Sequence, residues 1–265
     1  MNPSPDTSAP PVLEIAHLKK SFGPRVVLSD ISFSVPPGTI LSVLGRSGTG
    51  KSVLLKCIVG LLQPDSGEIR HKGASLRDPS AKSALRQTAS YVFQQNALFD
   101  SSTVYENVLL PLQARGKGRR SEWDARVREV LERLELGDAA QRYPSELSGG
   151  MQKRLAVARA LVTEPELVFF DEPTAGLDPL RRNAVFAMIA HLQRENKFTA
   201  IVVTHDVQEA LVVSSRILWL DAGHVRFEGP AAVFGESSDP DICSFRDNIG
   251  ALREAVRSSQ TPSPR

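Results

Sequence analysis

The stretch GRSGTGKS, residues 45–52, lies between a short apolar segment that ends at Leu44 and a segment of helical pattern that begins at Lys51. It matches the pattern GxxxxGK[ST], in which glycines let backbone N–H groups converge on phosphate oxygens without a Cβ in the way. A helix that starts at Lys51 would also aim the positive end of its dipole at those phosphates. A flexible glycine turn is the plainer alternative, but a chance match in a chain of this length is expected at about one per cent. The stretch therefore predicts a nucleotide-binding loop.

Two side chains of this loop have roles that depend on their chemical type. A lysine at position 51 would reach the β- and γ-phosphates, and a serine at position 52 would coordinate Mg2+. The candidate nucleotide-binding residues of the loop are Gly45, Arg46, Ser47, Gly48, Thr49, Gly50, Lys51 and Ser52.

Strand and helix patterns alternate along the rest of the chain. Strands are predicted at residues 12–22, 26–35, 39–44, 67–73, 89–93, 167–170, 199–204 and 217–220. Helices are predicted at residues 51–62, 121–136, 179–196 and 207–214, and the region of about 95–163 is expected to be helical. The segments LVFF and AIVV lack polar alternation, as expected of parallel strands that are covered on both faces. The pattern predicts an α/β fold with a helical insertion.

The composition is that of a globular protein. Of its 265 residues, 41% are hydrophobic and 23% are charged, which excludes a wholly disordered chain and a collagen-like repeat. Its 32 basic residues nearly balance its 30 acidic ones and its isoelectric point is about 8.6, so no nucleic-acid partner is expected. Cys57 and Cys243 lie far apart and in no metal-binding pattern, which indicates two reduced thiols in a cytosolic protein.

Both ends of the chain have the composition of disordered segments. Residues 1–11 contain four prolines among small polar residues, and residues 259–265 read SQTPSPR. Residues 12–235 are expected to form the main domain, with a helical subdomain at about 95–163. Residues 236–258 are expected to form a helical extension, because Phe245, Ile249, Leu252 and Val256 have the spacing of one helix face. Packing on its own core is favoured for this extension, and docking of a regulatory subunit or a second protomer is the alternative.

The sequence contains no candidate membrane span. No segment reaches the roughly 20 mostly apolar residues that cross a bilayer, and the stretch MNPSPDTSAPP lacks the basic and apolar regions of a signal peptide. If the protein acts at a membrane, a partner is expected to supply the embedded part.

Two acidic residues directly follow an apolar strand. Asp171 and Glu172 come after LVFF, and side chains in this position lie at the carboxyl edge of the sheet, where ligands bind in α/β proteins. Taken alone, such a pair is more often a turn or a helix start. Together with a phosphate-binding loop, it predicts that Asp171 holds Mg2+ and that Glu172 orients or deprotonates an attacking water.

A second helix start also has the features of a phosphate-binding surface. Ser148, Gly149 and Gly150 open a helical pattern within LSGGMQKR, residues 147–154. Ordinary N-capping explains this stretch when it is taken alone. Because a Ser-Gly-Gly helix start can also bind phosphate, a chain with two such surfaces could hold nucleotide between two copies of itself.

The order of these elements resembles that of the ATP-binding cassette (ABC) ATPases, and the resemblance covers about residues 12–235. LSGGM is similar to the LSGGQ signature of that family, and AGLD, which ends at Asp178, is similar to its D-loop. His205, after the strand AIVVT, lies at the position of the switch histidine, and Gln94, after YVF, matches the Q-loop glutamine. Phe22 matches the aromatic residue that stacks on adenine, which is usually a tyrosine. Taken alone, each of these residues also fits a structural role, such as a helix cap for Asp178 before Pro179.

The resemblance implies a P-loop NTPase fold with an α/β core, an N-terminal antiparallel β subdomain and a helical insertion. It implies a head-to-tail homodimer that binds ATP and Mg2+ between its subunits and hydrolyses the ATP. The implied catalytic residues are Glu172, His205 and Gln94, and the implied metal ligands are Ser52, Gln94 and Asp171. The implied ATP contacts outside the loop are Phe22, Ser148, Gly149, Gly150 and Asp178, with residues 148–150 supplied by the other subunit.

Within the family, two stretches resemble the branch that serves phospholipid-trafficking transporters of the Mla type, which are associated with Mce proteins. One is the GGM-x-KR variant of the signature, in which Met151 replaces the usual glutamine, and the other is residues 96–108. This resemblance implies integral membrane permease subunits, a small regulatory subunit and a lipid-binding Mce-type partner. It also implies a peripheral position at the cytoplasmic face of the inner membrane. Residues 148–150 are intact despite Met151, so ATPase activity is expected.

Three other functions are consistent with the sequence to different degrees. A transporter for another substrate is the nearest alternative. A soluble ABC switch that acts on ribosomes or DNA usually has two cassettes or a long coiled coil, and this chain has one phosphate-binding loop and no heptad run. A cassette that binds ATP without turnover would not need Glu172 and His205. The basic run at residues 115–120 is typical of a solvated linker, and contact with lipid headgroups or nucleic acid is the lesser option.

Overall fold

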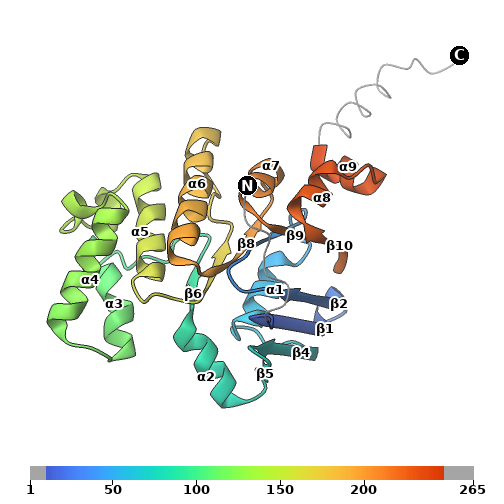
Figure 1. Ribbon diagram of the computed structural model, residues 1–265, viewed down its shortest axis with the longest axis horizontal. Coiled ribbons are helices and arrows are strands. Elements are labelled where there is room, and N and C mark those ends of the chain that lie inside the picture. Colours follow the sequence, from blue (N-terminus) through green and yellow to red (C-terminus); the bar gives the residue numbers. More distant parts are fainter. Residues whose placement is uncertain (1–9, 248–265) are drawn as a thin grey trace, which may run out of the picture.

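The structure is a computed structural model that describes residues 10–247 (Figure 1). The expected disorder at residues 1–9 and 259–265 lies outside the described residues, as does the part of the helical extension that follows Asp247. Residues 10 and 11 are described and belong to no helix or strand.

Strands and helices alternate through the described chain. The strands are β1 (Leu13–Phe22), β2 (Arg25–Val35), β3 (Ile40–Leu44), β4 (Ser66–His71), β5 (Ala74–Ser75), β6 (Ala89–Val92), β7 (Leu167–Asp171), β8 (Thr199–Thr204), β9 (Arg216–Asp221) and β10 (His224–Pro230). The α-helices are α1 (Lys51–Ile58), α2 (Pro79–Thr88), α3 (Val104–Arg115), α4 (Arg120–Arg133), α5 (Gly149–Leu161), α6 (Pro179–Asn196), α7 (Val207–Val213), α8 (Ala231–Glu236) and α9 (Pro240–Asp247). The strands form one mixed sheet in the order β5-β4-β1-β2-β10-β9-β3-β8-β7-β6.

The middle of the sheet is parallel and fully covered. β9, β3, β8, β7 and β6 pair in parallel, and every residue of β3, β7 and β8 is buried. Successive residues of these strands face opposite sides, so Phe170 belongs to the hydrophobic cluster that contains Leu155 and Phe186, whereas Phe169 belongs to the cluster that contains Leu54. This burial on both faces confirms the prediction from the runs LVFF and AIVV.

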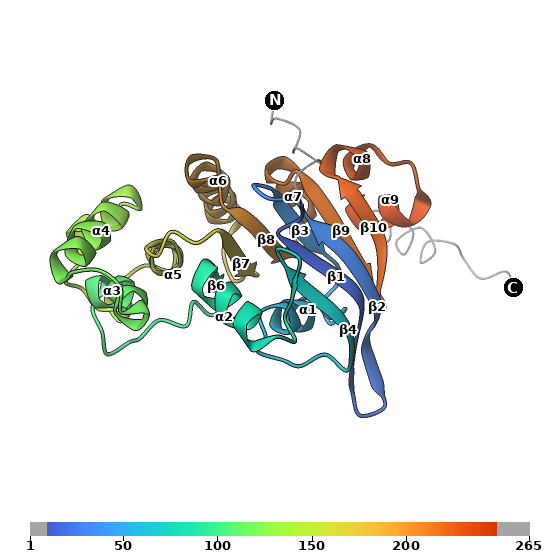
Figure 2. The same ribbon diagram turned by 60° about the horizontal axis from the view of Figure 1, so that its bottom comes forward.

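Helices cover both faces of the parallel strands. Figure 2 shows α6 and α7 on one face and α1 and α2 on the other. Helices α3, α4 and α5 lie together to one side of the sheet, beyond α6 (Figures 1 and 2). This side region is the helical insertion that the sequence predicts between β6 and β7.

The N-terminal part of the sheet is antiparallel. β1 pairs with β2 on one side and with β4 on the other, and β4 pairs with β5. A single bridge between Asp30 of β2 and His224 of β10 joins these strands to the rest of the sheet. Leu28 and Ile31 of β2 share a hydrophobic cluster with Leu54 of α1, so the antiparallel strands pack over the helix that follows the phosphate-binding loop. The predicted fold class, an α/β core with N-terminal antiparallel strands and a helical insertion, is confirmed.

Several elements differ from their predictions. The helix predicted at residues 121–136 ends at Arg133, because Glu135 adopts a left-handed backbone and Gly137 begins a short 3-10 turn. The region from residue 95 becomes helical only after Thr103, which caps α3. The extension predicted as one helix from residue 236 is interrupted at residues 237–239, since the proline at position 240 disfavours helical backbone before it. The elements α2, β5, β10 and α8 were not predicted.

Two sequence-based expectations concern membranes and cysteines. Within residues 10–247, no helix combines the length and the apolar character that a bilayer crossing requires.

Cys57 and Cys243 are both free thiols, and burial raises the pKa of the Cys57 thiol to about 11. The Cys57 side chain therefore behaves as a small apolar group of α1.

A pair of glycine substitutions tests the packing of β4 against β1. Gly67 has a φ of 94°, and a Cβ at this position would lie 2.4 Å from the carbonyl oxygen of His17. Gly73 has a φ of 80° but nothing within 4 Å of such a Cβ. We expect Gly73→Ala to lower the free energy of unfolding by about 1 kcal/mol, and Gly67→Ala to lower it by at least about 2 kcal/mol. Urea denaturation followed by circular dichroism measures both, and equal losses would contradict the close backbone contact.

Candidate nucleotide-binding site

The phosphate-binding loop connects β3 to α1. Helix α1 begins at Lys51, directly after Gly50, whose φ of 100° favours glycine. A Cβ on Gly50 would lie 2.9 Å from Leu28 Cδ2 and 3.1 Å from the carbonyl oxygen of Val27, so β2 leaves no room for a side chain. The first N–H groups of α1 lack partners within the helix and are available to phosphate oxygens.

The ammonium group of Lys51 is buried beneath this loop. Its Nζ donates hydrogen bonds to the carbonyl oxygens of Gly45 (2.8 Å) and Arg46 (3.1 Å), and it lies 3.7 Å from Glu172 Oε1. Burial lowers the pKa of Lys51, and the negative charges of Glu172 and Asp171 partly offset this effect. A cation fixed by loop carbonyls at this depth is suited to an anionic ligand held by the same loop.

Asp171 ends β7 with both of its carboxylate oxygens hydrogen-bonded. Ser52 Oγ donates to Oδ1 (2.8 Å), and the hydroxyl of Tyr91 donates to Oδ2 (2.9 Å). Burial and the nearby Asp171 charge both raise the pKa of Tyr91, so its phenol keeps the proton that it donates. Two donors on two sides fix the orientation of this buried carboxylate.

Glu172 adopts a backbone conformation that is unusual for its residue type. Its φ is 48°, in the left-handed region, while its N–H donates to the carbonyl oxygen of Val203 on β8 (2.9 Å). Its Oε2 accepts a hydrogen bond from Nδ1 of His205 (2.8 Å), which follows β8. Because left-handed backbone persists in such residues only where the surroundings fix it, the strain at Glu172 is typical of a functional position.

Lys51, Ser52, Glu172 and His205 border one cavity of about 1180 Å³ at the carboxyl ends of the parallel strands. Among the residues predicted from sequence, those that line the cavity are Phe22, Gly45, Arg46, Ser47, Gly48, Gly50, Lys51, Ser52, Gln94, Glu172 and His205. The cavity is large enough for a nucleotide, and its donors and charges lie where the glycine loop meets α1.

Five other predicted residues do not line the cavity, and Asp171 lies behind Ser52. Thr49 turns its hydroxyl to the carbonyl oxygen of Arg46 within the loop (2.9 Å). Ser148 caps α5 and accepts from the N–H of Met151 (3.3 Å), and Asp178 caps α6 and accepts from the N–H of Arg181 (3.0 Å). Both caps fit the structural role that their sequences also indicated. The remaining two, which follow Ser148 at the start of α5, are Gly149 and Gly150.

Oxygen donors for a divalent cation are present at the cavity. Ser52 Oγ and Asp171 Oδ1 lie 2.8 Å apart at the end of the phosphate-binding loop. Among residues 10–247, no group of three or more His, Cys, Asp or Glu side chains could hold a metal ion. This donor set fits Mg2+, which usually takes one or two protein oxygens together with substrate phosphates and water.

The structure adds residues that sequence reasoning missed. Tyr91 reaches Asp171 from the neighbouring strand, and its place in β6 next to β7 is the only signal that could have found it. Arg182 and Asp206 form an ion pair at the cavity (2.9 Å), and Asp206 also accepts from the hydroxyl of Thr174 (2.7 Å). Phe245 of α9 lines the cavity as well. The sequence placed Phe245 in a helical extension but did not predict that it contacts the nucleotide cavity.

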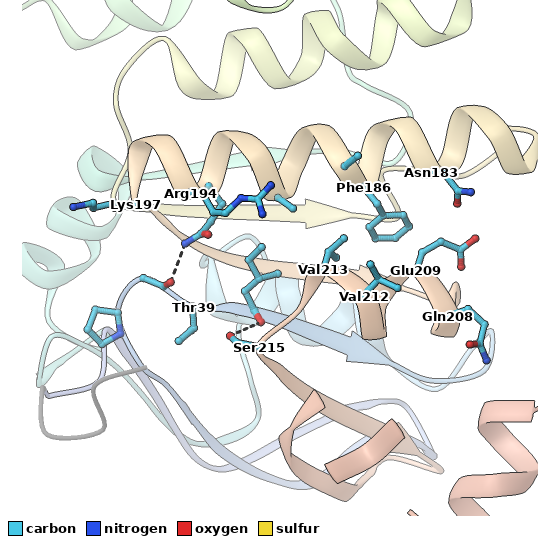
Figure 3. A pocket seen from close by; sticks show the side chains of 16 residues that line it. Thr39, Asn183, Phe186, Arg194, Lys197, Gln208, Glu209, Val212, Val213 and Ser215 are labelled. Atoms are coloured by element: carbon cyan, nitrogen blue, oxygen red, sulfur yellow. Dashed lines mark hydrogen bonds between the residues drawn. The ribbon is translucent and has the colours of Figure 1, made fainter. Parts of the chain in front are cut away.

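A second hollow, of about 980 Å³, runs along α6 from Asn183, near the start of that helix, to Lys197, directly after its end (Figure 3). It is a groove between α6 and α7, lined by apolar side chains such as Phe186, Val212 and Val213, and it includes Ile40 at the start of β3. No residue of the phosphate-binding loop lines this groove, but Gln208 and Glu209 line both the groove and the first cavity, so the two hollows adjoin there.

The fold and the first cavity together define an ATPase of the P-loop α/β class, because a glycine loop, a buried lysine and two strand-end carboxylates meet at one sheet edge. The family model described as ABC transporter matches residues 28–175 of this chain. The chain belongs to the ABC transporter family, as the resemblance of its motifs predicts, and it is an ATPase of that family.

Individual relatives agree with this assignment. The chain is 37% identical, over 252 residues, to the sulfate/thiosulfate import ATP-binding protein CysA of Escherichia coli K12, and the match covers 94% of this chain and 68% of CysA. It is 40% identical, over 220 residues, to the glutamine transport ATP-binding protein GlnQ of the same organism, with 82% of this chain and 91% of GlnQ covered. Among solved structures, cbiO1 from Clostridium perfringens, part of the ABC transporter complex cbiONQ, matches with a TM-score of 0.79 and 29% identity, over 93% of this chain and all of that one.

The hydrogen bond from Tyr91 to Asp171 leads to a prediction about metal binding. Tyr91→Phe removes one of the two donors that orient the carboxylate, while the ring stays between Phe93 and Phe169. We expect about a tenfold weaker affinity for Mn2+, used as a spectroscopic substitute for Mg2+, in the presence of ATP, with little change in thermal stability. Electron paramagnetic resonance titration of free Mn2+ measures this affinity, and an unchanged value would show that Ser52 alone suffices to orient Asp171.

Proposed function

We propose that this chain hydrolyses Mg2+-bound ATP through Glu172 and uses the cycle to energise a membrane transporter. The observation that carries the proposal is the position of the Glu172 carboxylate. One of its oxygens lies 3.7 Å from Lys51 Nζ, and the other accepts from His205 at 2.8 Å. A carboxylate between a phosphate-binding cation and an imidazole is suited to act on a water beside the terminal phosphate.

In the proposed mechanism, each group has one task. The loop N–H groups and Lys51 hold the phosphates, and Ser52 and Asp171 would hold Mg2+, which would supply positive charge beside them. Glu172 orients the attacking water and accepts its proton. His205 keeps the Glu172 carboxylate in place through its Nδ1–H, and Gln94 contributes to the same cavity from the end of β6. Phe22, which is half exposed at the end of β1, provides an aromatic face for the adenine ring.

The proposed active unit is a head-to-tail homodimer. Ser148, Gly149 and Gly150 start α5 outside the cavity of their own chain, yet they have the features of a phosphate-binding helix start. A second copy of the chain would bring these residues and Asp178 to the open side of the nucleotide. ATP then joins the two subunits, and its hydrolysis separates them.

The proposed membrane partner is a permease. CysA and GlnQ are named as ATP-binding proteins of import or transport systems, and cbiO1 is part of a transporter complex. By analogy, this chain docks on integral membrane subunits from the cytoplasmic face of the inner membrane. The helical region α3–α5, which projects beyond α6, is the part that follows Gln94 in sequence and therefore the proposed route of coupling (Figure 2).

The proposed cargo is phospholipid, which moves between membranes with the help of a Mce-type lipid-binding partner and a small regulatory subunit. This proposal rests on residues 96–108 and on the variant signature that contains Met151. The relatives named above favour a second candidate, the import of a small solute, since their names refer to sulfate or thiosulfate and to glutamine.

The assigned role of Glu172 predicts the behaviour of Glu172→Gln. The amide keeps the size of the side chain but cannot accept a proton, so kcat for ATP hydrolysis should fall at least about 100-fold while ATP still binds. Phosphate release measures the first quantity, and isothermal titration calorimetry measures the second.

Glu164→Gln is the matched control, because Glu164 is an exposed carboxylate that pairs with Arg126 (3.2 Å) away from the cavity. Its kcat should equal that of the unaltered protein. Rapid hydrolysis by purified Glu172→Gln would reject Glu172 as the base.

The proposed partners and cargo predict what copurifies with the tagged chain from detergent-solubilised membranes. We expect a multispanning permease with bound phospholipid, identified by mass spectrometry of proteins and lipids. A permease without phospholipid would favour the small-solute candidate. Ribosomal or DNA-repair proteins without a permease would contradict the transporter itself.

A further inference from the structure

The segment 94–103 joins β6 to α3 without regular secondary structure, yet side chains from two helices hold its backbone in place. Asn107 of α3 is fully buried and holds the second half of the segment. Its Nδ2 donates to the carbonyl oxygens of Phe99, Ser102 and Thr103, and its Oδ1 accepts from the N–H of Phe99. This half is therefore fixed to the helix that it precedes.

Two cations of α5 hold the first half of the segment. Lys153 Nζ donates to the carbonyl oxygen of Gln94 (2.8 Å). Arg159 donates through Nη1 to the carbonyl oxygen of Ala97 (2.6 Å) and through Nη2 to that of Asn96 (2.7 Å). Three carbonyl groups within four residues thus accept charge-assisted hydrogen bonds from one helix, and such bonds are about twice as strong as neutral ones.

The burial of these cations has an energetic cost that no carboxylate offsets. Lys153 is only 6% exposed, and burial lowers the pKa of both Lys153 and Arg159. Within residues 10–247, neither side chain forms an ion pair; their hydrogen bonds go to the three carbonyl oxygens, and the Arg159 guanidinium also lies 5.8 Å from the centre of the Phe99 ring. A buried cation directed only at one stretch of main chain indicates that the conformation of this stretch matters.

The conformation that is held is a strained one. Asn96 and Ala97 have φ values of 61° and 48°, two successive left-handed residues without glycine, and the side-chain oxygen of Asn96 is buried without a hydrogen-bond partner. Backbone of this kind persists only where the surrounding contacts fix it, and such strain occurs mostly at functional sites. Arg159 binds the carbonyl groups of both residues from α5, and Lys153 binds that of Gln94, two residues before them.

We propose that Lys153 and Arg159 are positioning residues for ATP hydrolysis, which clamp the main chain of residues 94–97 so that the Gln94 side chain stays at the nucleotide cavity. Gln94 is exposed and lines the cavity, although its own carbonyl group is bound to α5. The same helix starts at Ser148, in the region proposed to meet the nucleotide of a partner subunit. The clamp therefore makes Gln94 and the start of α5 move together. The inference rests on the proposed ATPase function of Gln94.

Lys153→Met and Arg159→Met test the clamp, because methionine fills the apolar part of each site and donates no hydrogen bond. We expect amide hydrogen exchange in the 94–103 segment to speed up at least about tenfold, with no change in β3, β7 or β8. We also expect kcat to fall about 10- to 100-fold while KM for ATP changes less than about threefold. Arg159→Lys keeps the charge and a donor, so its amide exchange should be slower and its kcat higher than those of Arg159→Met.

Arg115→Met is the matched control. The guanidinium of Arg115 also donates to a main-chain carbonyl oxygen, that of Thr163 (2.7 Å), and burial also lowers its pKa. It has no hydrogen bond to the 94–103 segment, so exchange there and kcat should equal those of the unaltered protein.

Hydrogen exchange does not require turnover, so it separates failure of the clamp from failure of the proposed ATPase function. Unchanged exchange in the 94–103 segment of both methionine variants would overturn the proposal, whatever their activity. Faster exchange together with unchanged kcat would also overturn it, because Gln94 would then not depend on the clamp. If Arg159→Met unfolds as a whole, Lys153→Met and Arg159→Lys decide the question by the same two readouts.

Discussion

The site depends on the parallel register of three strands. Leu44 of β3 pairs with Thr204 of β8, and Asp171 of β7 pairs with Val203, so the strands end level with one another. The phosphate-binding loop, Glu172 and His205 each follow one of these ends directly. A slip of one residue would displace a strand end by about 3.3 Å and turn its side chains to the other face. The 2.8 Å hydrogen bonds from Ser52 to Asp171 and from His205 to Glu172 could not survive such a slip.

The charged residues Lys51 and Glu172 are the ones whose placement in the site costs folding free energy. Lys51 loses hydration, and its nearest carboxylate oxygen is 3.7 Å away, which is longer than a hydrogen bond. Glu172 adds a left-handed backbone, worth about 1–2 kcal/mol of strain for a residue with a Cβ. The strands that carry these groups are wholly buried, and their apolar side chains pack on both faces of the sheet. The buried core thus stabilises a sheet edge that carries a strained Glu172 and a dehydrated Lys51. A bound polyanion would accept hydrogen bonds from the first N–H groups of α1 and from Lys51.

The sequence predicted those parts of the fold and of the site that depend on neighbouring residues. The loop at residues 45–52 and the pair Asp171 and Glu172 could be found because each is a short stretch of residue types in a fixed order. His205 and Gln94 required the resemblance to a family, since a single histidine or glutamine has no local signature. The contact of Tyr91 with Asp171 depends on the register between β6 and β7, which no local pattern specifies. Helix α2 was missed because only Ala81 and Leu85 are buried on it, so its apolar period is weak, although Asp78 before a proline is a typical helix start.

Helix α5 connects two requirements that a nucleotide-driven dimer must meet at once. Its start, at Ser148, is open and has the character of an anion-binding surface, while the buried Lys153 and the half-buried Arg159 farther along hold the segment that carries Gln94. A ligand that bound to the start of α5 would therefore act on the same helix that holds Gln94 at the nucleotide cavity of its own chain. Three charge-assisted hydrogen bonds to main-chain carbonyl groups form this link, and the packing of Leu98 and of the Phe99 ring on the same region adds to it. A substitution in the 94–103 segment that preserves its backbone would leave the link intact, whereas loss of either cation would not.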